Sequence, residues 1–196
     1  MGNTIILSGP VRGDELPRVK KAFAQNPAIQ LAILRNSWGG HAPTGYRLGE
    51  LFRARGMTTA VSGYCVSSCS RMFLGGRERV FTDDYPPEQT FVGFHGHYDA
   101  KGKLNAQRVA EYGLYAWIIK FSDGKADEAL VRRWITLPRA SGAVNFYHPD
   151  LAASHKASVF VCDGSERNWP LACASLPTDA LERGVITSSR RISSPG

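Results

Sequence analysis

The alternation of strand and helix signals along the first half of the chain constrains its fold most. Short apolar or β-branched runs predict strands at residues 4–7, 29–34, 58–62, 79–82 and 90–94. Helical spacing of apolar residues predicts helices between them, at residues 14–24, 44–55 and 67–74. Successive β-then-α units favour parallel strands with right-handed crossovers. The sequence therefore predicts an α/β fold of repeated units with mostly parallel strands.

The pattern changes after His97. One long helix is predicted over residues 105–121 and a second from 127 to about 135. Residues 138–177 are rich in glycine, proline and serine, so we expect mostly loop there.

A short helix over residues 178–183, with Gly184 as its C-cap, and a strand over 185–187 are predicted to close the fold. No domain boundary is visible. We therefore expect one domain over residues 1–187 and a flexible tail over 188–196.

Composition excludes some classes of function. The chain has 196 residues, 43% of them hydrophobic, which is enough for a real core. No apolar run approaches the ~20 residues that a membrane span needs. The net charge of +7 would favour anionic partners. The basic residues are scattered, however, and no nucleic-acid motif accompanies them, so we expect no nucleic-acid partner and no membrane span, but a peptide or protein substrate.

The four cysteines form two close pairs, Cys65 with Cys69 and Cys162 with Cys173. The even number is compatible with two disulfides and an oxidising compartment, periplasmic or secreted. Three pairings are possible, and four buried reduced thiols are the alternative. No leader precedes the strand at residues 4–7, so an exported protein would begin here near its mature start.

Three separated segments carry the parts of an acyl-transfer site. Ser67 lies at the predicted start of a helix, where the Ser68 N–H is a natural oxyanion donor. Gly39 and Gly40 follow a buried strand and could supply a second backbone donor. His95 ends another strand and has the right chemistry for a general base. Taken alone, Ser67 could also be a simple helix N-cap.

These motifs, in this order, resemble the ClpP-like serine peptidases of the crotonase superfamily. The likeness is greatest to exported ClpP-related bacterial proteins that place a serine between two cysteines. The segments that carry the resemblance are Asn36–Gly40, Gly63–Cys69, Phe73–Arg77, Gly93–His95 and Asp179–Ile186.

The resemblance implies that Ser67 is the nucleophile and His95 the base, with Gly40 and Ser68 as oxyanion donors. It also implies an extended peptide substrate that pairs with a strand edge, and no cofactor. The family usually has proline where this chain has Trp38, a departure expected to reshape the turn or cover the site.

The third member of a catalytic triad is not evident. The resemblance places it near Ala172, and Asn168 is the first candidate, followed by Asp163 and Asp150. An asparagine would orient the imidazole but stabilise its cation less than a carboxylate does. A slow hydrolase, a Ser67–His95 dyad and an inactive protein therefore remain open.

Rival hypotheses come from other classes. One is a non-catalytic binding or scaffold protein of the same fold; another is a crotonase-type enzyme acting on a coenzyme A thioester. His41, His95 and His97 could indicate a metal, but alternating strand positions point to opposite faces, so we expect none. The helix segment Tyr112–Ile119 is apolar on nearly every face. Core burial explains one face, and the other suggests a contact between identical subunits or an apolar substrate groove.

Overall fold

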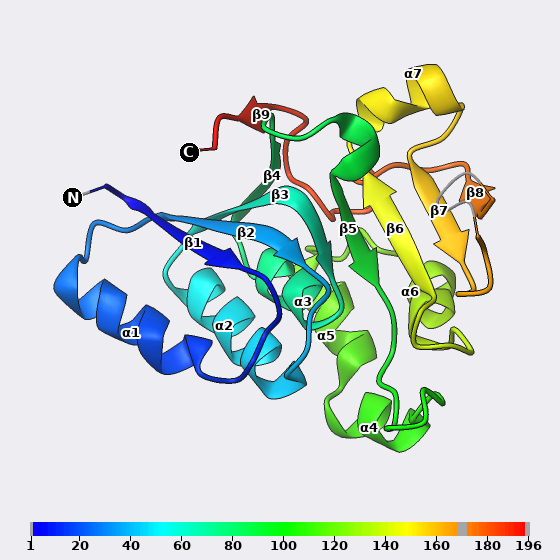
Figure 1. Ribbon diagram of the computed structural model, residues 1–196, viewed down its shortest axis with the longest axis horizontal. Coiled ribbons are helices and arrows are strands. Elements are labelled where there is room, and N and C mark those ends of the chain that lie inside the picture. Colours follow the sequence, from blue (N-terminus) through cyan, green and yellow to red (C-terminus); the bar gives the residue numbers. More distant parts are fainter. Residues whose placement is uncertain (1, 168–171, 195–196) are drawn as a thin grey trace. The chain divides into compact units, whose positions relative to one another are not determined.

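The computed structural model describes residues 2–167 and 172–194 (Figure 1). The chain forms two compact units. The first comprises the residues up to Phe91 together with those from Ile186 onward, and the second comprises Val92–Val185.

The first unit is built on a parallel sheet. Its strands, in spatial order, are β1 (Thr4–Ser8), β2 (Leu31–Ser37), β3 (Thr58–Val66), β4 (Glu78–Thr82) and β9 (Arg191–Ile192). Ile33, Ala60 and Val80, from three adjacent strands, are fully buried and pack together. Parallel sheets are commonly covered on both faces, which fits the short run Ala32–Leu34 of β2, where three consecutive apolar residues are buried.

Each helix of the first unit follows a strand. The helices are α1 (Glu15–Gln25), α2 (Ala42–Ala54) and α3 (Ser68–Leu74), with the short 3₁₀ helix η1 (Pro87–Gln89) after β4. In Figure 1, α1 and α2 lie side by side below β1 and β2. The strand-helix alternation predicted for this half of the chain is confirmed.

The second unit mixes helices with antiparallel strands. It contains most of β5 (Phe91–Phe94), then α4 (Ala106–Glu111), α5 (Leu114–Phe121), α6 (Glu128–Ile135), β6 (Ala143–Tyr147), η2 (Pro149–Leu151), α7 (Ala152–His155), β7 (Val159–Cys162) and β8 (Ala174–Leu176). The strands β6, β7 and β8 are antiparallel neighbours. With the parallel strands of the first unit, they make a mixed α/β fold with mostly parallel strands, so the predicted class is confirmed. None of the helices in the described ranges is long and apolar enough to cross a membrane.

The prediction of a single helix over residues 105–121 is wrong. The segment forms two helices, α4 and α5, which are separated at Gly113, whose φ of 55° is left-handed. Glycine adopts this conformation without steric cost, and the chain turns there before α5 begins. The predicted second helix is confirmed as α6, where the Asp127 carboxylate accepts the Leu130 N–H at 2.8 Å.

The loop predicted over residues 138–177 is also wrong. It contains β6 and β7, which pair as an antiparallel hairpin, and the short β8. All residues of β6 and β7 are buried, so these runs show no alternation of apolar and polar residues. Without that period, the glycine and proline residues around these strands predict a loop instead.

The segment after β8 also differs from the prediction. Residues 180–184 form turns rather than the predicted helix, although Gly184 has the left-handed φ of 64° expected of a C-cap. The segment 185–187 is not a strand, but the Thr187 N–H donates to the Arg79 carbonyl of β4 at 3.0 Å. Further along, within the tail expected to be flexible, β9 pairs with β4.

Candidate active site

Ser67 occupies a strained turn between β3 and α3. Its φ of 59° and ψ of −126° lie in a region that residues other than glycine rarely adopt. A serine on a sharp strand-to-helix turn of this kind is typical of hydrolase nucleophiles. Its side chain is half-buried and makes no capping hydrogen bond to α3. The hydroxyl is therefore not used as the simple N-cap considered from the sequence.

The turn is braced on both sides of the serine. Cys65 and Cys69 form a disulfide with a Cα–Cα distance of 5.2 Å, one sulfur in β3 and the other in α3. The Ser70 hydroxyl donates to the Ser67 carbonyl at 2.6 Å. These contacts tie the start of α3 to the end of β3 and hold Ser67 in its strained conformation.

Gly39 lies directly against the Ser67 turn. A Cβ added at Gly39 would be 2.6 Å from the Ser67 Cβ and 2.9 Å from the Ser68 nitrogen. Gly39 also has a φ of 89°, which favours glycine. The predicted meeting of the diglycine turn with the serine turn is therefore present within the first unit.

The backbone around Gly40 is fixed by Val11. The Val11 N–H donates to the Gly39 carbonyl at 2.8 Å, and the His41 N–H donates to the Val11 carbonyl at 2.8 Å. The Gly40 N–H takes no part in these two bonds. The Ser68 N–H lies in the first turn of α3, where backbone donors have no partner within the helix.

The close contact between α2 and α3 positions Ser68. A Cβ at Gly45 in α2 would be 2.4 Å from the Ser68 carbonyl oxygen. At the other end of α3, a Cβ at Gly75 would be 2.1 Å from the Gly49 carbonyl oxygen. Only glycine permits this approach of the two backbones.

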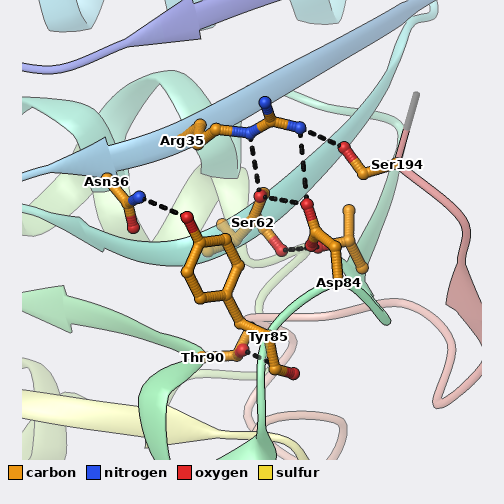
Figure 2. Close-up of polar contacts among 9 residues, drawn as sticks. Arg35, Asn36, Ser62, Asp84, Tyr85, Thr90 and Ser194 are labelled. Atoms are coloured by element: carbon orange, nitrogen blue, oxygen red, sulfur yellow. Dashed lines mark hydrogen bonds and ion pairs between the residues drawn. The ribbon is translucent and has the colours of Figure 1, made fainter. Parts of the chain in front are cut away.

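A polar network ties the strands that carry these turns to the end of the chain (Figure 2). Arg35 in β2 donates to the Ser62 hydroxyl in β3 at 3.1 Å and to the Ser194 hydroxyl at 2.6 Å. The Ser62 hydroxyl in turn donates to the Asp84 carboxylate at 2.8 Å. Burial raises the pKa of the Asp84 carboxyl, but hydrogen bonds led by those from Thr82 and Ser62 hold the pKa below its ordinary value.

Sequence reasoning missed this network. The bonds that join Arg35, Ser62, Asp84 and Ser194 span 22 to 159 positions along the chain, so no local spacing reveals them. The same end of β2 carries a second polar contact, in which the Asn36 amide donates to the Tyr85 hydroxyl at 2.8 Å.

His95 follows β5 directly and belongs to the second unit. Its half-buried ring stacks on Tyr98 at a centroid distance of 5.1 Å, and the Tyr98 hydroxyl donates to the Leu137 carbonyl at 2.8 Å. The nearby His97 is buried and stacks on Tyr112 at 4.8 Å. The two histidines therefore pack against different tyrosines.

The candidates for a third catalytic residue have different positions. Asn168 lies outside the described residues. The Asp163 carboxylate, on a half-exposed side chain, is 3.1 Å from the Arg139 guanidinium, and the Ser165 hydroxyl and N–H donate to it. These bonds, led by that of the Ser165 hydroxyl, lower the pKa of Asp163. Asp163 is therefore engaged with Arg139 and Ser165.

The third candidate, Asp150, is mostly exposed at 71%, and its carboxylate lies 3.3 Å from Nδ1 of the buried His148.

One group of potential metal ligands is present in the second unit. Cys162, Glu166 and Cys173 have ligand atoms within 4.8 Å of one another. The two cysteines are joined in a disulfide, so their sulfurs are not thiolate ligands. The group as it stands offers a single carboxylate, whose oxygens accept the Asp163 and Gly164 N–H groups.

The apolar segment Tyr112–Ile119 contributes to the core of the second unit. In α5, Leu114, Trp117 and Ile118 are buried, while Tyr115 and Ile119 are half-buried. One face of the helix thus serves the core.

Comparison of the structure with solved proteins identifies the fold. ClpP1 from Listeria monocytogenes is similar with a TM-score of 0.55 and 14% identity over 98% of this chain and 92% of that one. A point mutant of ClpP1 from the same organism is similar with a TM-score of 0.56 and 13% identity over 94% of this chain and 89% of that one. No family model matches the sequence, and no curated protein matches it.

The chain therefore has the fold of the ClpP-like serine peptidases. At such low identity the comparison establishes the architecture alone.

Proposed function

We propose that the protein is a serine peptidase with Ser67 as nucleophile and His95 as general base. The conformation of Ser67 carries this proposal. A hydroxyl that forms no cap, on a strained turn braced by a disulfide, is costly to maintain for packing alone. The ClpP-like fold supports the same reading.

In the proposed reaction, the Ser67 oxygen attacks the carbonyl carbon of a peptide bond and the His95 imidazole takes the hydroxyl proton. The backbone N–H groups of Gly40 and Ser68 stabilise the oxyanion. The C–N bond then breaks and the leaving amine takes the proton from His95. Water repeats the sequence on the acyl-enzyme, releasing the acid and restoring Ser67.

The third member of the site is proposed to be Asn168, with Asp163 and Asp150 as the alternatives from sequence. The Asp163 carboxylate is engaged with Arg139 and Ser165, and the Asp150 carboxylate lies against His148. An asparagine would orient the His95 ring while leaving catalysis slow.

We further propose export to the periplasm or the exterior, and self-association. Two disulfides within one small protein are typical of an oxidising compartment. The half-buried second face of α5, with Tyr115 and Ile119, is the surface we propose for contact between identical subunits.

A fluorophosphonate probe tests the catalytic proposal because it phosphonylates activated serines: the serine oxygen bonds to phosphorus and fluoride leaves. We expect Ser67→Ala to abolish labelling and His95→Ala to slow it by roughly 10²-fold or more. The matched control is Ser154→Ala, which removes an exposed hydroxyl in α7 and should leave labelling unchanged. Labelling that persists in Ser67→Ala would remove this serine from the mechanism. Absence of labelling in the unaltered protein would favour the non-catalytic scaffold.

A further inference from the structure

An exposed indole stands beside the Ser67 turn. Trp38 is 60% exposed, the more exposed of the two large hydrophobic side chains found at the surface of the described residues. It immediately precedes Gly39, which lies against Ser67. Tryptophan is enriched at binding surfaces, because one large ring supplies much apolar contact area and a polar N–H.

The indole is held in place by two other rings. The Trp38 ring lies 4.3 Å from that of Tyr64 and 6.3 Å from that of Phe91, and the Tyr64 and Phe91 rings are 6.1 Å apart. Phe91 is buried and Tyr64 is half-buried, so the cluster has a fixed base. We call Trp38, Tyr64 and Phe91 the aromatic platform.

The platform is tied to the reacting atoms through short stretches of backbone. Trp38 is two residues before Gly40, one of the proposed oxyanion donors, and Tyr64 is three residues before Ser67. Because consecutive Cα atoms are about 3.8 Å apart, the Cα of Trp38 lies within about 8 Å of that of Gly40, so we expect the platform to face a substrate residue close to the cleaved bond. The platform is therefore placed to contact a substrate side chain near the cleaved bond.

We propose that the aromatic platform is a specificity subsite that selects peptides with an aromatic side chain beside the cleaved bond; this inference rests on the proposed peptidase function. Rings of Phe, Tyr or Trp would stack on the exposed indole in offset or tilted geometry, as Tyr64 already does. Aliphatic side chains would gain only buried area. Lysine and arginine could also bind the ring face, but the net charge of +7 opposes their approach.

Peptide binding to the Ser67→Ala protein tests the subsite without requiring catalysis. The probes are capped alanine peptides with a central Phe, Leu or Lys, titrated by NMR. We expect the Phe peptide to bind roughly tenfold more tightly than the Leu peptide. Adding Trp38→Ala should abolish the preference, whereas Trp38→Phe should retain most of it. Ile6→Ala, the control at the other exposed hydrophobic side chain, should change nothing.

Several outcomes overturn the proposal. Equal binding of the Phe and Leu peptides, tighter binding of the Lys peptide, no detectable binding of the Phe peptide, or a preference that survives Trp38→Ala would each do so. The far-UV and thermal unfolding profiles of Trp38→Ala should match those of the parent, which separates a lost subsite from a lost fold. Failure of the peptidase function itself appears independently, as absence of Ser67-dependent labelling by a fluorophosphonate that carries no aromatic group.

Discussion

The two compact units position their chemically important residues by different means. In the first unit, Ser67 and Ser68 are placed by backbones that touch through glycines, at Gly39 and Gly45. In the second unit, His95 follows a strand anchored by large rings. Its neighbour Phe94 stacks on Trp134 at 4.6 Å, and both rings contact Phe146 edge-on.

This difference explains why the Ser67 turn can be held in a strained conformation, while the strand before His95 needs no strain. Backbone-to-backbone contacts leave no room for adjustment, so they can hold Ser67 at its unfavourable φ and ψ. Side-chain packing of rings fixes a strand more loosely, because rotamers can adjust to small changes. We therefore expect larger side chains at the contact glycines to destabilise the first unit, and truncation of the packed rings to destabilise the second.

The largest effect should come from filling the contact between α2 and α3. Gly45→Val would press a side chain against the Ser68 carbonyl, where even a Cβ would be at 2.4 Å, and should cost about 3 kcal/mol of unfolding free energy. Labelling at Ser67 should fall with it. Urea denaturation and probe kinetics measure the two effects. Glu50→Val, on the exposed side of the same helix, is the control. A Gly45→Val protein of unchanged stability would contradict the close approach.

The next largest effect should come from removing one or the other disulfide. The Cys162–Cys173 bond spans 11 positions and the Cys65–Cys69 bond only 4, so loop entropy predicts losses of about 3 and about 2 kcal/mol when each pair is replaced by alanine. Thermal unfolding measures both. Labelling of Ser67 by the fluorophosphonate should show the opposite order. Loss of the Cys65–Cys69 bond should reduce labelling more, since only this bond braces Ser67. If both replacements affected labelling equally, the local role of the Cys65–Cys69 bond would be refuted.

A smaller effect concerns acid stability. Because the pKa of Asp84 is lowered in the folded state, its stabilising contribution is present above the ordinary value of 3.8 and is lost as the pH falls through the folded-state pKa. Asp84→Asn should cost about 1–2 kcal/mol at pH 7 through its charged hydrogen bonds. The difference from the parent should close below about pH 4.

The matched control for Asp84 is Asp163→Asn in the second unit. The pKa of Asp163 is also lowered, first by the Ser165 hydroxyl, but its side chain is half exposed and its contacts are local. Denaturation at several pH values should show a smaller loss than for Asp84→Asn. A loss as large would mean that the network of Arg35, Ser62 and Ser194 adds nothing particular to Asp84.

The smallest effect should be a gain in stability, from replacing Ser67 by glycine. Ser67→Gly relieves a positive φ and should stabilise the protein by about 1 kcal/mol, after the entropy that glycine adds to the unfolded chain. Ser67→Ala keeps the strain and should not stabilise. Both variants lose labelling. Calorimetry separates them, and equal melting temperatures would show that the turn stores no strain.

Sequence reasoning succeeded where the information was local. The strands and helices of the first 94 residues follow from apolar periodicity, and the two close cysteine pairs of the sequence are the two pairs that are bonded. It failed between residues 138 and 187. There, buried strands such as Ala143–Tyr147 lack any period, and turn-forming residues masked them.

The sequence by itself determined the α/β class, the place of Ser67 between a strand and a helix, and the order of the candidate motifs. Each of these depends on residues close together along the chain. Only the tertiary structure decided the contact of Gly39 with the Ser67 turn, the network around Arg35 and Asp84, and the platform formed by Trp38 with Tyr64 and Phe91. These contacts join residues distant in sequence, and their distances and angles are set by how strands and helices pack rather than by any local preference.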